Sequence, residues 1–173
     1  MKNLVAPEKD RDPRFGFFGL GLVIPILVVC LWAGAAHAAK RAGVPAFDGA
    51  QEALVRKKVM AVLQAHGFEL VKSRQIDSTL KSLGTRLDSN DGFQALAKEL
   101  GLQAIVTGEV GKKRAKISVH DGKDGSLLGE ANFAGANPRA IMNEVGRSFW
   151  SKLGGEIERG KTPSGSLRWA KVR

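Results

Sequence analysis

The sequence predicts an α+β domain, with a small mixed sheet that ends in a three-stranded antiparallel meander and helices packed on one face. Apolar residues recur every three or four positions within 55–63, 76–83, 93–100 and 141–153, which is typical of helices with one buried face. Between the last two segments the period changes to two, as it does in a half-buried strand. A chain of 173 residues has room for one ordinary domain with accessory segments.

The domain is expected to begin with a strand, a helix and a second strand. Residues 44–47 form a short extended segment in this interpretation. The helix that follows carries Val55, Val59, Val62 and Leu63 on one stripe, and Gly67 offers a left-handed stop. Residues 68–71 then make a short strand.

Two further helices are expected before the meander. Ile76, Leu80 and Leu83 indicate turns of helix that end at Gly84. Ser89 or Asn90 caps the next helix, which ends at Gly101. Its apolar stripe consists of Phe93, Leu96, Ala97 and Leu100.

The meander is predicted from three short runs, 103–110, 114–120 and 126–133, because turn residues separate them. In the middle run, apolar residues at 115, 117 and 119 alternate with polar residues at 116, 118 and 120. One face of the sheet is therefore expected to be covered and the other to face water.

A last helix should begin at Asn137 and Pro138, in the usual order of cap and first turn. Its stripe consists of Ile141, Val145, Phe149 and Leu153, and Gly154 and Gly155 should end it. We therefore expect the domain to span 39–156 and a basic flexible tail to span 157–173.

The segment before the domain has the features of an export signal or a membrane anchor. No charged residue lies between Arg14 and Lys40, and residues 15–32 are almost wholly apolar. Ala36-His37-Ala38 has the small-x-small pattern of a signal peptidase site, although the apolar run is longer than a usual signal core. Residues 1–38 are thus a cleaved signal peptide or a single-span anchor. Either one predicts a periplasmic domain, exported or tethered to the inner membrane by residues 15–38.

The chain is basic, with 27 Lys and Arg against 17 Asp and Glu and a net charge of +10. Such a charge favours polyanionic partners, here anionic lipid or acidic wall polymer. Two clusters are candidates for this contact. The first is the expected hairpin tip, Lys112, Lys113 and Arg114, and the second is the tail, Lys161, Arg168, Trp169, Lys171 and Arg173.

No catalytic, cofactor-binding or metal-binding residue is predicted. Residues 155–162 match a phosphate-loop pattern, but a helix precedes them and Pro163 follows, which is the wrong context. Residues 121–125 are better explained as a turn than as a calcium loop. His120 is expected to be a solvated surface histidine, and His66 to interact with the end of a helix. The only cysteine, Cys30, lies in the apolar run, so the domain can form no intrachain disulfide.

Three phrases resemble the amino-terminal domain of TolB and related bacterial envelope domains, including curli-secretion and penicillin-binding-protein-activator lipoproteins. They are residues 100–108, 119–129 and 149–153. The resemblance covers about 44–156 and implies the same order of elements, with Gly108 where a neighbouring side chain crosses closely. It also implies a binding or assembly module that contacts an envelope protein partner. Its motifs are structural, so it assigns no functional residue.

The expected function is therefore that of a non-enzymatic, periplasmic or membrane-associated binding module. A nucleic-acid-binding domain is the main alternative because the chain is basic and the sheet has an open face. The export segment argues against it, as does the lack of paired aromatic residues for stacking on bases. An unrecognised enzyme is the other alternative, although the sequence indicates no nucleophile and base pair.

Overall fold

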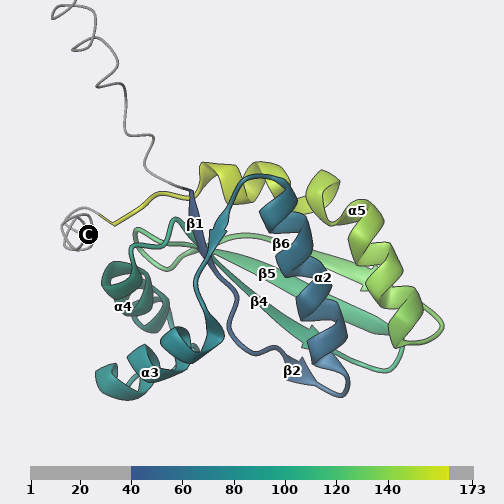
Figure 1. The fold of residues 1–173 in the computed structure, drawn as a ribbon, viewed down its shortest axis with the longest axis horizontal. Helices are drawn as coiled ribbons and strands as arrows, with labels where there is room; N and C mark the ends of the chain where they lie inside the picture. Colours follow the sequence, from purple (N-terminus) through teal and green to yellow (C-terminus); the bar gives the residue numbers. More distant parts are fainter. Residues whose placement is uncertain (1–39, 164–173) are drawn as a thin grey trace, which may run out of the picture. The chain divides into compact units, whose positions relative to one another are not determined.

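The computed structural model describes residues 40–163 (Figure 1). The expected signal peptide or anchor, 1–38, lies outside the described residues, and so do Arg168, Trp169, Lys171 and Arg173 of the tail cluster. No helix within 40–163 has the length and apolar character needed to cross a bilayer.

Six strands within the described residues form one mixed sheet in the order β3-β1-β4-β5-β6, with β2 paired to β4. Strand β1 is parallel to both β3 and β4, whereas β4, β5 and β6 form an antiparallel meander. The predicted α+β class and meander are confirmed. The strands are β1 (Arg41–Gly43), β2 (Asp48–Gly49), β3 (Glu69–Leu70), β4 (Ala104–Val110), β5 (Arg114–Asp121) and β6 (Leu127–Ala134).

The predicted position of the first strand, 44–47, is wrong. The strand spans Arg41–Gly43, and residues 44–47 are a loop. Pro45 within this loop has no backbone N–H to donate to a neighbouring strand. Val44 and Phe47 are nevertheless buried, so apolar character here indicated core packing rather than strand pairing.

Two helices cover one face of the sheet. Helix α2 (Glu52–Ala65) and helix α5 (Pro138–Arg159) cross the sheet side by side (Figure 1). Their predicted stripes point into the larger core, where they meet the alternating apolar residues of the meander. The largest fully buried side chains of this core include Leu63, Ile117, Phe133, Ile141, Phe149 and Leu153.

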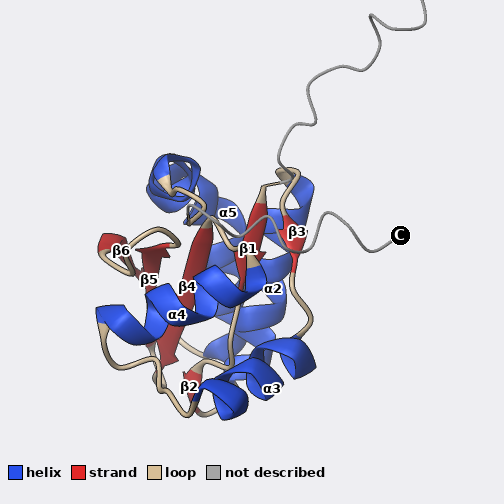
Figure 2. Cartoon of the chain, turned by 90° about the vertical axis from the view of Figure 1, so that its left-hand side faces the viewer, coloured by secondary structure: helices blue, strands red, loops and turns tan. Residues whose placement is uncertain are grey.

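The other face is also covered in part, so the expectation that helices pack on one face only is wrong. Helix α4 (Asn90–Leu100) lies in front of the strands in Figure 2. With helix α3 (Ser73–Leu83), it forms a second core that includes Leu102 and Ile105. The reason lies in β4, where Ala104 and Val106 belong to the first core and Ile105 to the second. A strand that is apolar on both faces needs cover on both faces.

The helix ends agree with the sequence in three helices and differ in the fourth. Gly84 and Gly101 end α3 and α4 in the left-handed conformation, and the Ser89 and Asn137 side chains cap α4 and α5. Gly154 and Gly155, however, do not end α5, which continues to Arg159. Ile157 lies one turn beyond Leu153 and is fully buried. Burying it contributes about 2 kcal/mol, which offsets the roughly 1 kcal/mol that each of the two helical glycines costs.

The first residues of the expected tail therefore belong to the folded domain. Gly160 and Pro163 are buried, and the Lys161 N–H donates to Asp121 Oδ1 at 2.8 Å. The domain boundary predicted after residue 156 is too early, and the packed structure reaches residue 163.

Candidate binding groove

The uncovered part of the second sheet face carries polar side chains from three neighbouring strands. In the register of the meander, Thr107 lies opposite Ser118, which lies opposite Glu130. One step along, Lys116 lies between Glu109 and Asn132. Directly paired residues share a face, so these side chains form a continuous polar surface.

This surface is hollowed into a groove. Two hollows, of about 610 and 420 Å³, share Asp48, Glu109 and Lys116 and therefore adjoin. Asp48 comes from β2. Leu87, Asp88 and Phe93, from the start of α4 and the loop before it, complete one wall of the second hollow. We call this continuous depression the sheet groove.

Carboxylates dominate the charge of the sheet groove. Lys116 Nζ lies 2.9 Å from Glu130 Oε2, and this hydrogen bond and ion pair raise the pKa of Lys116, with Glu109 adding to the effect. Within residues 40–163, Asp48, Asp88 and Glu109 form no salt bridge shorter than 4 Å. The groove is thus locally acidic on a chain of net charge +10.

His120 forms the floor of the groove beside α4. Its ring stacks on Phe93 with 3.7 Å between centroids and 18° between planes, and its Nδ1 lies 3.3 Å from the Gly125 carbonyl oxygen. Burial lowers the pKa of His120, opposed in part by this hydrogen bond. The expectation of a solvated histidine is wrong, because α4 packs on the face that was expected to face water. Since Nδ1–H donates to a carbonyl, Nε2 is left as an acceptor.

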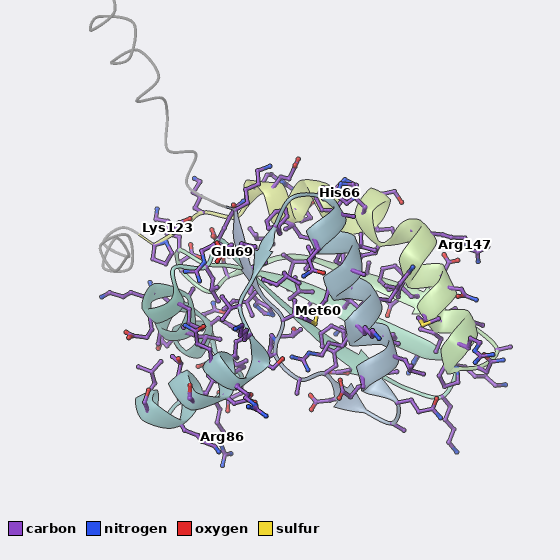
Figure 3. The ribbon with its side chains drawn as sticks, viewed as in Figure 1. Met60, His66, Glu69, Arg86, Lys123 and Arg147 are labelled. Atoms are coloured by element: carbon purple, nitrogen blue, oxygen red, sulfur yellow. The ribbon has the colours of Figure 1, made fainter. Side chains whose placement is uncertain are left out.

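The second histidine within residues 40–163, His66, lies on the opposite side of the sheet. His66 is the C-cap residue of α2, as its position predicts, and lies beside α5 (Figure 3). Its ring stacks on Trp150 with 3.6 Å between centroids and 5° between planes. His66 therefore joins the ends of two helices through ring packing, which the sequence did not indicate.

The segment 121–125 is a turn, as predicted. Asp121 Oδ1 accepts from the Lys123 N–H at 3.1 Å, and Asp124 Oδ1 accepts from the Ser126 N–H at 2.9 Å. Gly125 has a φ of +73°. Residues 155–159 of the phosphate-loop match are helical, so they do not form a loop around a phosphate.

Among the candidate cations that the structure describes, Lys161 lies apart from the hairpin tip. Lys112, Lys113 and Arg114 are exposed at the tip between β4 and β5, and Arg114 also lines the sheet groove. Lys161 is bonded to Asp121, at the opposite end of a ladder of seven residue pairs, which corresponds to about 20 Å at roughly 3.3 Å per residue. The hairpin tip and Lys161 therefore lie apart.

The structure adds a basic hollow of about 500 Å³ between α2 and α5, lined by Lys58, Ala140, Asn143, Gly146 and Arg147. The Lys58 side chain crosses Gly146 so closely that a Cβ at this position would lie 2.2 Å from Lys58 Cε. Lys113 is nearby, since its carbonyl accepts from Gly135 just before α5. Sequence inspection missed this hollow because its two cations lie in separate helices.

No protein-family model and no curated protein matches the chain. Among solved structures, the chain is similar to the C-terminal domain of LpoB from Salmonella enterica, with 17% identity and a TM-score of 0.46, over 64% of this chain and 92% of that one. The same domain from Escherichia coli matches with 16% identity and a TM-score of 0.44, over 62% of this chain and 90% of that one. TolB from Acinetobacter baumannii matches with 15% identity and a TM-score of 0.47, over 68% of this chain. The match spans 29% of that TolB chain. TolB is thus among the structures that the chain resembles, as the sequence phrases implied.

Proposed function

We infer that this protein is a non-enzymatic binding module of the bacterial cell envelope, and that it contacts a protein partner through the sheet groove. The observation that carries the proposal is the open strip of polar side chains on β4, β5 and β6, next to a face that α3 and α4 otherwise cover. Polar side chains on an uncovered, hollowed part of a sheet are accessible to another molecule. The resemblance of the three sequence phrases to envelope domains supports the same class of function.

A photo-crosslinking amino acid at Ser118 tests this proposal, because Ser118 lies in the groove on the central strand of the meander. The matched control carries the same amino acid at Ser151, which is exposed on α5, on the opposite face of the sheet. We expect a discrete protein adduct in cells from position 118 and not from position 151. Equal adducts from both positions, or none from either, would refute a specific contact through the groove.

The proposed location is the periplasm, reached by export or by a tether at residues 15–38. Support comes from the apolar run and from the small-x-small site that ends at Ala38. Cell fractionation with mass spectrometry of the amino terminus tests it. A mature chain that starts at Ala39 indicates cleavage, a full-length chain in the membrane fraction indicates an anchor, and a cytosolic chain refutes the location.

We also propose a contact between the hairpin-tip cations and anionic lipid or acidic wall polymer. Lys112 and Lys113 are exposed, and the Lys113 carbonyl accepts a hydrogen bond from the Gly135 N–H just before α5. Each basic group near an anionic surface contributes about 1 kcal/mol. Co-sedimentation of the double variant Lys112→Gln, Lys113→Gln with wall polymer should show weaker binding than that of Lys81→Gln on α3, and equal binding would refute the contact.

A further inference from the structure

We propose that the sheet groove binds a basic, extended segment of the protein partner and that it recognises lysine and arginine side chains. The inference rests on the proposed function, because it names the chemistry of the partner at the same site. It is carried by the charge of the groove, by its hydrogen-bonding groups and by its shape.

The charge of the groove is opposite to that of the chain. Asp48, Asp88 and Glu109 come from three separate segments and converge on one depression, where none of them has a salt bridge within the described residues. The nearest cation, Lys116, is held by Glu130 at 2.9 Å. Lys116 and Arg114 compensate the carboxylates of the groove only in part, and like charges that gather raise the free energy of the unbound protein, so a cationic ligand relieves this repulsion.

In the hollow beside α4, Lys116 is held by Glu130, and the other charged side chains, those of Asp48, Asp88 and Glu109, are acceptors. His120 offers Nε2 as an acceptor, because its Nδ1 faces the Gly125 carbonyl. The Ser118 hydroxyl lies 3.4 Å from Glu130 Oε2 and donates to it. A ligand must therefore bring its own donors. Arginine has five N–H donors and lysine three, which distinguishes them from acidic and amide side chains.

The shape of the groove suits an extended chain. It follows β5 from His120 to Arg114, over a length of about 20 Å at roughly 3.3 Å per residue. Side chains on one side of an extended peptide recur every second residue and meet carboxylates along such a path. Asp88 lines one hollow, and Asp48 and Glu109 line both, so cations at several points of the peptide find a carboxylate.

The test uses the full chain in a non-ionic detergent and two capped six-residue peptides, one alternating Ser and Arg and the other alternating Ser and Glu. Binding is followed by chemical-shift changes of the backbone amides. We expect the Arg peptide to bind, to shift resonances of β5 and to dissociate as salt is raised. The Glu peptide should not bind. Neutralising one exposed carboxylate, in Glu109→Gln or Asp48→Asn, should weaken binding by about three- to fivefold, the range of an exposed charge pair.

Asp77→Asn is the matched control, since Asp77 is exposed on α3 and does not line the groove. Its affinity should equal that of the parent. Equal loss in Asp77→Asn and Glu109→Gln, or binding of the Glu peptide, would overturn the proposal. It would also be overturned if the Arg peptide bound only after residues 164–173 were deleted, because the chain's own basic segment would then be the occupant.

The crosslink at Ser118 separates this inference from the proposed function. An adduct on a partner segment without Lys or Arg would overturn the basic-segment proposal and leave the binding function in place. The absence of any groove adduct would remove both.

Discussion

The ring of Phe47 lies against the backbone of Gly108, so closely that a Cβ at Gly108 would be 2.6 Å from Phe47 Cδ2. Phe47 is 4% exposed and precedes β2, whereas Gly108 lies in the middle of β4. The sequence resemblance implied a close crossing at Gly108, and the structure identifies the crossing residue. This contact fixes the loop between β1 and β2 to the sheet.

Gly108→Val should therefore destabilise the fold by about 2 kcal/mol, because overpacking of a core commonly costs 1–3 kcal/mol. Gly155→Ala is the contrasting change. A Cβ at Gly155 meets nothing within 4 Å, so Ala should stabilise α5 by about 0.5 kcal/mol. Urea unfolding midpoints measure both, and a Gly108→Val midpoint at or above that of the parent would refute the crossing.

Phe149→Ala should cost about 3 kcal/mol, the scale for emptying a buried aromatic site. Phe149 is fully buried, and its ring lies 6.3 Å from that of Phe133 between α5 and the sheet. Lys112→Ala, at the exposed hairpin tip, should leave the midpoint unchanged. If thermal and urea unfolding gave similar losses for the two variants, the packing of α5 on the meander would be wrong.

The chain end provides a third test. A chain that stops after Pro163 should keep the midpoint of the full protein, because the described packing is intact. A chain that stops after Arg159 loses the hydrogen bond from the Lys161 N–H to Asp121 Oδ1. Asp121 is only 7% exposed. A hydrogen bond to a charged group contributes about 1.5–3 kcal/mol, so a lower midpoint is expected. Identical unfolding midpoints for both chains would support the domain boundary that the sequence predicted after residue 156.

The stability of the fold should fall with acidification through His120. Burial lowers the pKa of His120 in the folded protein, so the unfolded chain binds the proton more readily. The His120 contribution is therefore complete above the unfolded pKa of about 6.5 and is lost as pH falls towards the lower folded value. Between about pH 7.5 and about pH 5, His120→Gln should lose less unfolding free energy than the parent. An equal loss in both would show that other groups cause the pH dependence.

Most helix ends were predictable from the sequence because they depend on neighbouring residues. The caps at Ser89 and Asn137 and the stops at Gly84 and Gly101 depend on residues within one turn, and each lies where its spacing predicts. The end of α5 was not predictable from its glycines. Burial of Ile157 is a tertiary contact, and it offsets the local cost of Gly154 and Gly155.

The sheet groove could not be predicted from sequence periodicity because it also depends on tertiary contacts. A helical stripe at Phe93 and Leu96 indicates one buried face, but not which face of the sheet it covers. His120 was therefore placed in water although α4 stacks Phe93 on it. Asp48, Asp88 and Glu109 are spread over about 60 residues, and only the pairing of β2 with β4 and the packing of α4 bring them together.

The position of β1 between β3 and β4 determines the order in which the domain can fold. Both partners of this strand follow it in the chain, and β4 begins at Ala104, some 60 residues after Arg41. Closing such a loop costs entropy before any hydrogen bond returns free energy, whereas the β4–β5 and β5–β6 hairpins form from neighbouring residues. The carboxyl-terminal half should thus assemble first, with the amino-terminal strand inserted afterwards as the step that completes the sheet. A chain that emerges amino terminus first would hold the β4 edge of this strand unpaired until β4 has been delivered, whereas β3 follows sooner.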